Sequence, residues 1–114
     1  MRLLIADDES SLAKALRAVL EDEGYNCGVC FDGNSAIHLI SQEIYDGLIL
    51  DIMIPEKNGY EVLNQIRKQK DDIPVLLLSA LNKVDDKVTG FDLDANDYLS
   101  KPFSTKELIA QVKM

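Results

Sequence analysis

Side chains that bind zinc or carry out redox chemistry are scarce in this chain of 114 residues. It contains one histidine, His38, and two cysteines, Cys27 and Cys30. Three such side chains cannot supply the four nitrogen and sulfur ligands of a structural zinc site. The C-x-x-C spacing can serve redox chemistry, but the pair lies in an expected strand, away from any helix N-terminus that would stabilise a thiolate. We therefore expect two packed strand residues in a reducing, cytoplasmic setting.

Long apolar runs and a basic surface are also missing. No apolar stretch approaches the length that crosses a membrane, and the opening segment MRLLIADDES lacks the pattern of a signal peptide. The formal net charge is −8, from 12 basic and 20 acidic residues. Because an acidic surface repels phosphate backbones and anionic lipids, we expect no direct contact with nucleic acid or with a membrane.

Short apolar runs alternate with segments of helical spacing along the chain. The runs at 3–6, 47–50 and 75–78 are continuous, a further run covers 26–31, and a short fifth one lies at 98–99. Continuous apolar strands are buried on both faces, which indicates a parallel sheet between layers of helices. The apolar faces of the five expected helices are Leu12, Leu16, Val19 and Leu20; Ala36, Ile37 and Ile40; Val62, Leu63 and Ile66; Val84, Val88 and Phe91; and Leu108, Ile109 and Val112.

Capping residues mark several helix ends. Asp32 can cap the second helix, and Ser104 with Glu107 forms a capping box for the last one. The helix expected at 84–93 is weak, because it contains an adjacent threonine and glycine. The last helix has barely three turns when the chain stops at Met114. We therefore expect one domain, residues 1–114, cut within its last helix from a longer protein.

Reactive side chains stand at the ends of four expected strands. They are Asp7 and Asp8 after the first strand, Asp51 after the third, Ser79 after the fourth and Lys101 after the fifth. The carboxyl ends of parallel strands share one edge of a sheet and bind ligands there, so these side chains should converge. Clustered carboxylates without histidine or cysteine favour magnesium, calcium or manganese. A metal beside an aspartate and a lysine is an arrangement suited to phosphoryl transfer.

Taken singly, these residues have ordinary structural explanations. Asp7 and Asp8 could be solvated acids at a helix start. Ser79 could be a turn residue, and Lys101 a surface lysine. Asp51 is harder to explain in this way, since it lies between the apolar triplets LIL and IMI and a buried unpaired carboxylate is costly. The common position at strand ends favours a site.

Four segments carry a strong resemblance to the receiver domains of two-component response regulators. They are LLIADDE at 3–9, LILDIMIPEKNGYEVL at 48–63, VLLLSA at 75–80 and ANDYLSKPF at 95–103, in the family's order. The resemblance implies a flavodoxin-like or CheY-like α/β fold, with a five-stranded parallel sheet of order 2-1-3-4-5 flanked by five helices. The details look most like the OmpR/PhoB subfamily, whose members usually carry a winged-helix DNA-binding domain after the receiver.

The resemblance also implies a phosphoacceptor site with a divalent cation. Asp51 would take a phosphoryl group from a phosphohistidine on a sensor histidine kinase. The cation would be Mg²⁺, with Mn²⁺ as an alternative, held by Asp7, Asp8, Asp51 and the main-chain carbonyl of Met53. No other cofactor is implied. The domain would not be an enzyme beyond its own phosphorylation from phosphodonors and its slow dephosphorylation.

The remaining site residues would form a switch. Ser79 would hydrogen-bond one phosphoryl oxygen and Lys101 would pair with another. Tyr98 would turn inward when Ser79 moves, and the Lys101–Pro102 peptide would be cis, which is affordable only before proline. The change would reach the face formed by the fourth helix, the fifth strand and the fifth helix. The expected output is transcription, through a C-terminal DNA-binding domain outside this chain.

Three residues depart from the family pattern without touching the expected site. Asp94 stands where glycine is usual, Asn96 where an acid is common, and Gln111 where the subfamily usually has a dimer-face arginine. Exposed ion pairs contribute roughly 0–1 kcal/mol each, and Gln111 leaves Asp97 without one. We therefore expect a monomer or weak dimer that phosphorylation strengthens in part. The other pairs expected on this face are Lys87 with Glu107, and Lys113 with Asp92 or Asp94.

Other functions could use the same pattern. A magnesium-dependent phosphatase or nuclease could use these carboxylates, but it would lack a histidine base and a substrate-binding cap. A flavodoxin-like nucleotide or flavin domain needs a phosphate-cradling loop after the first strand, where this chain has Asp-Asp-Glu, which repels phosphate. A degenerate receiver that is never phosphorylated is disfavoured by the complete set of five site residues.

Overall fold

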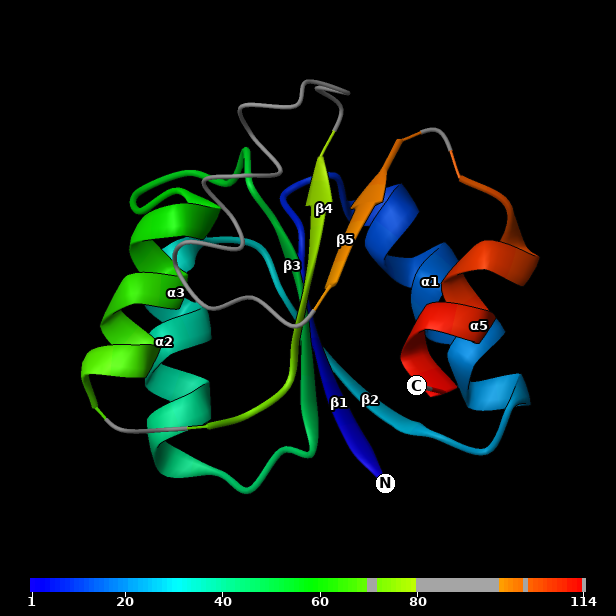
Figure 1. Cartoon of the computed structure of the whole chain (residues 1–114), viewed down its shortest axis with the longest axis horizontal. Coiled ribbons are helices and arrows are strands. Elements are labelled where there is room, and N and C mark those ends of the chain that lie inside the picture. The colour runs from blue at the N-terminus through cyan, green and yellow to red at the C-terminus, as the bar shows by residue number, and fades with distance from the viewer. Residues whose placement is uncertain (70–71, 80–96, 102, 114) are drawn as a thin grey trace.

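Five parallel strands form the centre of the fold in the computed structural model, which describes residues 1–69, 72–79, 97–101 and 103–113 (Figure 1). The strands are β1 (Arg2–Ala6), β2 (Asn26–Cys30), β3 (Gly47–Asp51), β4 (Val75–Ser79) and β5 (Asp97–Ser100). Their order in the sheet is β2-β1-β3-β4-β5, and every neighbouring pair is parallel. The predicted sheet order is therefore confirmed.

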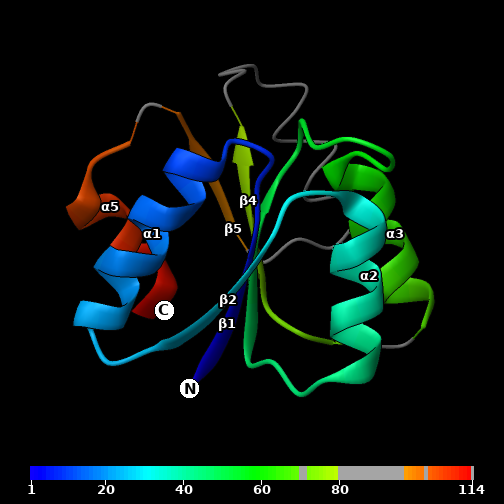
Figure 2. The ribbon, with the colours of Figure 1, turned by 180° about the vertical axis from the view of Figure 1, so that it is seen from behind.

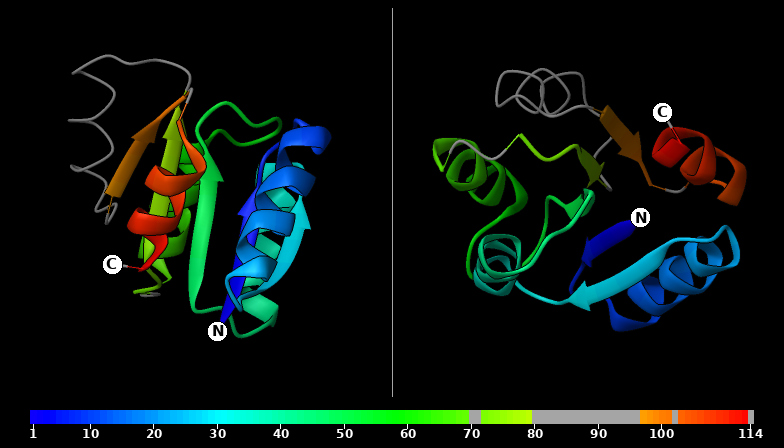
Figure 3. Two further views of the ribbon diagram at one scale, coloured as in Figure 1. Left: turned by 90° about the vertical axis from the view of Figure 1, so that its right-hand side faces the viewer. Right: turned by 90° about the horizontal axis from the view of Figure 1, so that it is seen from below.

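Helices cover both faces of this sheet. The described part of the chain contains four: α1 (Ser10–Asp22), α2 (Gly33–Gln42), α3 (Gly59–Lys68) and α5 (Thr105–Lys113). Figures 1 and 2 show α1 and α5 on one face and α2 with α3 on the other, and Figure 3 shows the same layers from the side and from below. The predicted helix at 84–93, with Val84, Val88 and Phe91, lies outside the described residues. Among the described helices none combines the length and apolar composition needed to cross a bilayer.

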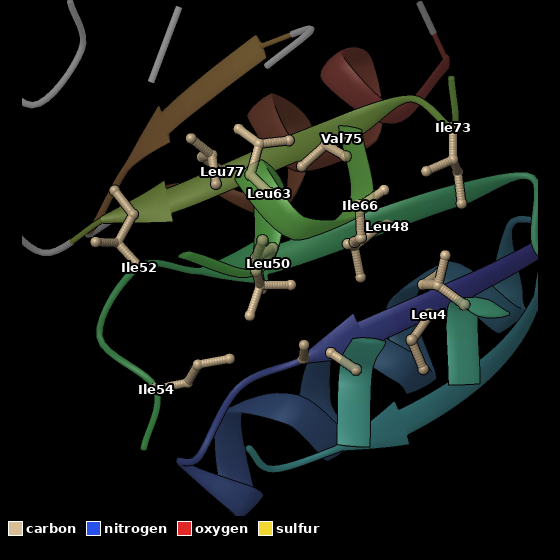
Figure 4. Close-up of a cluster of buried hydrophobic side chains, with 14 of the residues drawn as sticks. Leu4, Leu48, Leu50, Ile52, Ile54, Leu63, Ile66, Ile73, Val75 and Leu77 are labelled. Carbon is tan, nitrogen blue, oxygen red and sulfur yellow. The ribbon is translucent and has the colours of Figure 1, made fainter. Parts of the chain in front are cut away.

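Alternation along the strands explains why their sequences are apolar without interruption. Leu48 and Leu50 of β3 pack in the cluster under α2 and α3, part of which is shown in Figure 4. Ile49 between them packs in the second cluster, under α1 and α5. Successive side chains of a strand point to opposite faces, so a strand covered on both sides is apolar at every position. Each buried leucine or isoleucine contributes roughly 1.5–3 kcal/mol of transfer free energy.

The predicted caps are present at two helix N-termini. The Asp32 carboxylate accepts hydrogen bonds from the amide and hydroxyl of Ser35, at 2.7 and 2.9 Å. These bonds hold the pKa of Asp32 below its ordinary value. At α5 the Ser104 hydroxyl accepts from the Glu107 amide, while the Glu107 carboxylate accepts from the Ser104 amide. Both caps satisfy amide groups that the first helical turn leaves without partners.

The two cysteines lie on opposite faces of β2. Cys27 packs in the cluster under α1 and Cys30 in the cluster under α2 and α3. Residues three apart on a strand point in opposite directions, so their sulfur atoms cannot pair. Both are free and buried, and burial raises the pKa of both thiols, that of Cys30 to about 12. The expectation of two packed strand residues is confirmed.

Candidate functional site

The carboxyl edge of the sheet brings together the reactive side chains of distant segments. Asp7 follows β1, Asp51 ends β3, Ser79 ends β4 and Lys101 follows β5. Carboxylate oxygens of Asp7, Asp8 and Asp51 lie within 4.8 Å of one another. The Lys101 Nζ lies 3.3 Å from Asp7 Oδ2 and 3.2 Å from Asp51 Oδ2. The structure thus assembles three carboxylates and an ammonium from segments that are up to 94 positions apart.

The two buried carboxylates are held in the same way. Asp7 is fully buried, and its Oδ1 accepts a hydrogen bond of 3.0 Å from the Glu9 amide. Asp51 is 4% exposed, and its Oδ1 accepts a hydrogen bond of 3.1 Å from the Met53 amide. In each case Oδ2 faces Lys101. Every one of these four oxygens therefore has a polar partner, which buried carboxylates require.

The charges at this site are unbalanced. Burial raises the pKa of Asp7, and the neighbouring charge of Asp51 raises it as well, against the Glu9 amide and Lys101, which lower it. Burial alone would lower the pKa of Lys101, but the charges of Asp51 and Asp7 outweigh it and raise that pKa. One ammonium cannot neutralise three carboxylates. An all-oxygen donor set with excess negative charge fits a hard divalent cation such as Mg²⁺.

The raised pKa of Asp7 predicts that ionisation of this carboxyl lowers the stability of the folded domain. A raised pKa means that the folded state favours the protonated carboxyl. The stabilisation that the protonated Asp7 gives is fully present below the ordinary aspartate pKa of 3.8. It is lost as pH rises through the raised pKa of Asp7 in the folded state. In metal-free protein at pH 7, Asp7→Asn should therefore raise the free energy of unfolding, on the order of 1 kcal/mol once solvent screening is allowed for.

Denaturant unfolding in chelator at pH 7 and pH 3 measures this effect. The gain should be present at pH 7 and absent at pH 3, where the parent carboxyl is already protonated. Asp72→Asn is the matched control, because Asp72 is exposed and away from the cluster. An equal gain at both pH values would assign it to packing and contradict this explanation.

The predicted switch residues lie in β4 and β5. Ser79 is fully buried at the end of β4, and its carbonyl accepts a hydrogen bond of 2.6 Å from the Lys101 amide. Tyr98 pairs with Leu77 in the β4–β5 ladder and is 9% exposed, so its side chain already lies inward, against the cluster under α2 and α3. The Lys101–Pro102 peptide, predicted to be cis, lies outside the described residues.

Sequence reasoning did not predict how the segment between β3 and α3 is held. Asn58 caps α3, and Asn58 and Glu61 form a capping box that the Asn58-x-x-Glu61 spacing could have indicated. Gly59 begins α3 directly against the end of β3. A Cβ at Gly59 would lie 2.6 Å from Ile52 Cα and 2.8 Å from the Asp51 carbonyl oxygen. Only glycine allows this approach, which keeps the acceptor strand and α3 in contact.

Three other predictions concern charged and polar residues beyond the site. Gln111 and Asp97 line one hollow of about 450 Å³ at the opposite end of the sheet from the carboxylates. The Lys113 Nζ lies 3.6 Å from Glu23 Oε1, a partner that was not predicted. The partners predicted for Lys113, Asp92 and Asp94, lie outside the described residues. So do Asn96 and Lys87, the predicted partner of Glu107.

Comparisons with known proteins identify close relatives over the whole chain. The transcriptional regulatory protein DltR of Streptococcus agalactiae serotype III (strain NEM316) is 41% identical over 114 residues, which are 100% of this chain and 51% of DltR. The receiver domain of the Francisella response regulator 1452 has a TM-score of 0.95 at 38% identity, covering 98% of this chain and 93% of that one. Response regulator protein TrrA of Thermotoga maritima, in complex with Mg(2+)-BeF, has a TM-score of 0.89 at 34% identity, covering 98% and 96%.

The extent of these similarities defines what the chain is. It spans about half the length of the curated relatives it matches, but 93% and 96% of the two solved chains. Residues 3–113 match the family described as the response regulator receiver domain. The fold, with strand order β2-β1-β3-β4-β5, agrees with that family. The chain therefore belongs to the receiver domains of two-component response regulators.

Proposed function

We propose that this chain is a phosphorylation switch whose acceptor is Asp51. Receiver domains are regulatory domains rather than enzymes. The observation that carries the proposal is the position of Asp51, which is buried beside the acids Asp7 and Asp8, with Lys101 Nζ in contact with both Asp51 and Asp7. Its donor is a phosphohistidine on a sensor histidine kinase, or a small acyl phosphate. The domain itself contributes only its own phosphorylation and a slow dephosphorylation.

Mg²⁺ is the proposed cation, and Mn²⁺ is an alternative with the same preference for oxygen ligands. Asp7, Asp8, Asp51 and the main-chain carbonyl of Met53 would hold it. When bound, the cation neutralises charge that develops on phosphoryl oxygens. The related TrrA structure in complex with Mg(2+)-BeF supports this choice. Mg²⁺ usually keeps several water ligands, so one side of its site must face solvent. Asp8 fits that side, because its side chain is exposed while Asp7 and Asp51 are buried.

The transfer itself needs one nucleophile and two stabilising side chains. A carboxylate oxygen of Asp51 forms a bond to phosphorus, while the bond from phosphorus to the donor nitrogen or oxygen breaks and its electron pair leaves with the donor. Lys101, 3.2 Å from Asp51 in the unphosphorylated domain, pairs with a phosphoryl oxygen. Ser79, joined to Lys101 by a main-chain hydrogen bond, donates its hydroxyl to another. No step requires a side chain that acts as a general base.

Incubation with acetyl phosphate followed by intact mass analysis tests the proposal. The parent protein should gain one phosphoryl group with Mg²⁺ and none with chelator. Asp8→Ala should gain little at the same Mg²⁺ concentration and should lose most of the thermal stabilisation that Mg²⁺ gives the parent. Asp72→Ala, which changes an exposed acid outside the site, should behave as the parent. Labelling without any divalent cation, or turnover of an added phosphomonoester, would contradict this function.

The output of the switch is proposed to be transcription, as in the OmpR/PhoB subfamily. DltR is a transcriptional regulatory protein, and this chain covers 51% of its length, which leaves room there for an output domain. Ser79 and Tyr98 would carry the signal from Asp51 to the face that includes β5 and α5. Direct contact with nucleic acid or membrane is not proposed for this acidic domain. A cytoplasmic location is proposed, because both cysteines are buried strand residues and form no disulfide framework of the kind that small secreted domains use.

We expect the unphosphorylated domain to be a monomer or weak dimer, and a beryllofluoride mimic to promote partial dimerisation through the face that includes β5 and α5. Gln111→Arg should strengthen that dimer by supplying a partner for Asp97. Glu107→Gln should weaken it, because the charge is lost while the amide oxygen can still accept the capping hydrogen bond from Ser104. Sedimentation of each variant with and without the mimic measures these changes. A tight dimer without the mimic, or one indifferent to Glu107→Gln, would contradict this expectation.

A further inference from the structure

The loop between β3 and α3, residues 52–58, contacts the N-terminus of α2. The Gly33 amide donates a hydrogen bond of 3.0 Å to the Pro55 carbonyl. The Asn34 Nδ2 donates a hydrogen bond of 2.7 Å to Glu56 Oε2. A Cβ at Gly33 would overlap the main chain of Lys57, so the two segments are in direct contact. The start of α2 therefore holds the middle of the loop that follows the acceptor strand.

Glu56 needs to be held because its backbone is strained. Its φ is 70°, and it is the one non-glycine residue with positive φ in the described part of the chain. This left-handed conformation is unfavourable for residues with a Cβ other than asparagine, aspartate and histidine, and persists where surrounding contacts impose it. Three contacts do so here: the Asn34 side chain on the Glu56 carboxylate, the Gly33 amide on the Pro55 carbonyl, and a hydrogen bond of 3.0 Å from the Lys57 amide to the same carbonyl, across Glu56 itself.

The other end of the loop is fixed to the sheet and to α3. The Ile52 amide donates to the Leu78 carbonyl at 2.9 Å, and the Gly59 amide donates to the Ile52 carbonyl at 2.8 Å. Met53 lies between this anchor and the turn at Glu56. Its amide donates to Asp51 Oδ1, and its side chain is 61% exposed and so fixes little. The course of the main chain at Met53 therefore depends on both anchors.

We propose that Asn34 is a positioning residue for the site. Together with the Gly33 and Lys57 amides, it holds Glu56 in the left-handed conformation and so fixes the turn and, through the turn, the Met53 main chain beside Asp51. Asn34 contributes no atom to the carboxylate cluster and would act only through the loop. The inference rests on the proposed function in one respect, since the Met53 carbonyl is a proposed ligand of Mg²⁺.

The test combines Asn34→Ala with Glu56→Gly, a change that removes both the strain and the carboxylate that Asn34 binds. Glycine adopts positive φ without cost, so Glu56→Gly should keep the turn in place without help from Asn34. In the parent background Asn34→Ala should weaken Mg²⁺ binding and slow Asp51 labelling by about 3-fold to 10-fold, the size of effect that one hydrogen bond gives. In the Glu56→Gly background the same substitution should change neither quantity by more than about 2-fold.

Amide hydrogen exchange of the metal-free protein gives a second readout that does not depend on Mg²⁺. Asn34→Ala should speed exchange at Gly33 and Met53 and leave the amides of α2 beyond its first turn unchanged. Gln42→Ala is the matched control, because Gln42 is an exposed amide side chain at the other end of the same helix. This control should alter neither exchange at Met53 nor Mg²⁺ affinity.

Three results separate the possible failures. A parent that is labelled at Asp51 while Asn34→Ala binds Mg²⁺ as tightly as the parent would overturn this inference and leave the proposed function standing. If Asn34→Ala weakens Mg²⁺ binding equally with glutamate and with glycine at position 56, Asn34 does not act through the strained turn. That result would also overturn this inference. A parent that neither binds Mg²⁺ nor takes a label would overturn the proposed function, and this inference with it.

Discussion

Asp51→Asn should abolish the phosphoryl mass gain from acetyl phosphate at any Mg²⁺ concentration. The carboxamide has almost the same shape, so the side chain can still accept the hydrogen bond from the Met53 amide at this buried position. It cannot form an acyl phosphate, because its nitrogen is not a nucleophile of comparable strength and its oxygen carries no charge. The expected loss is therefore of chemistry rather than of folding, and the melting temperature of the variant should not fall.

The matched control for this prediction is Asp46→Asn. Asp46 accepts a hydrogen bond from the Arg2 amide at the opposite end of the sheet, and an asparagine there can accept it too. This control should be labelled as fast as the parent. If Asp51→Asn is labelled to the same extent as the parent and the control, the acceptor is a different residue and the assignment is wrong.

Lys101→Met should strongly destabilise the metal-free domain. Methionine keeps much of the apolar length of the side chain but removes the charge that faces Asp7 and Asp51. Two buried carboxylates then remain without a cation. We expect a loss of about 3 kcal/mol in the free energy of unfolding, which is the low end of the range for a broken buried pair because the ammonium is partly exposed. Chemical denaturation in chelator measures this loss.

Mg²⁺ should restore part of this lost stability. A bound cation neutralises the same carboxylates, so the stabilisation by Mg²⁺ should be larger in Lys101→Met than in the parent. Lys14→Met is the control, because Lys14 is exposed on α1, and it should change neither stability nor the Mg²⁺ response. A Lys101→Met variant as stable as the parent in chelator would show that the two ion pairs contribute little to the fold.

The sequence predicts the fold well because one physical rule governs most of it. Continuous apolar runs become strands covered on both faces, and the two clusters around Leu50 and Ile49 confirm this. The predicted strands ended one residue early at Leu50 and at Leu78. The ladder continues because Asp51 pairs with Leu78, and Ser79 with Ser100, so these polar residues belong to the strands themselves. Local apolarity does not reveal such pairing.

The candidate site could be predicted only in outline. Asp7, Asp51 and Lys101 each follow or end a predicted parallel strand. This position alone was enough to predict that they share one edge of the sheet, without any knowledge of side-chain contacts. The hydrogen bond between Asn34 and Glu56 could not be predicted, because it joins positions 22 residues apart and depends on a positive φ that glutamate seldom adopts. Exposed polar pairs of this kind follow from the fold and leave no periodic pattern in the sequence.

Chemical trapping of the phosphorylated residue tests the central claim most directly. Borohydride reduces an acyl phosphate on aspartate to homoserine, which releases the phosphate and marks the position permanently. After treatment with acetyl phosphate and Mg²⁺, peptide mass mapping should find homoserine at position 51 and aspartate unchanged at Asp7 and Asp8. Homoserine at either of those acids, or phosphate retained on a serine after reduction, would contradict Asp51 as the acceptor.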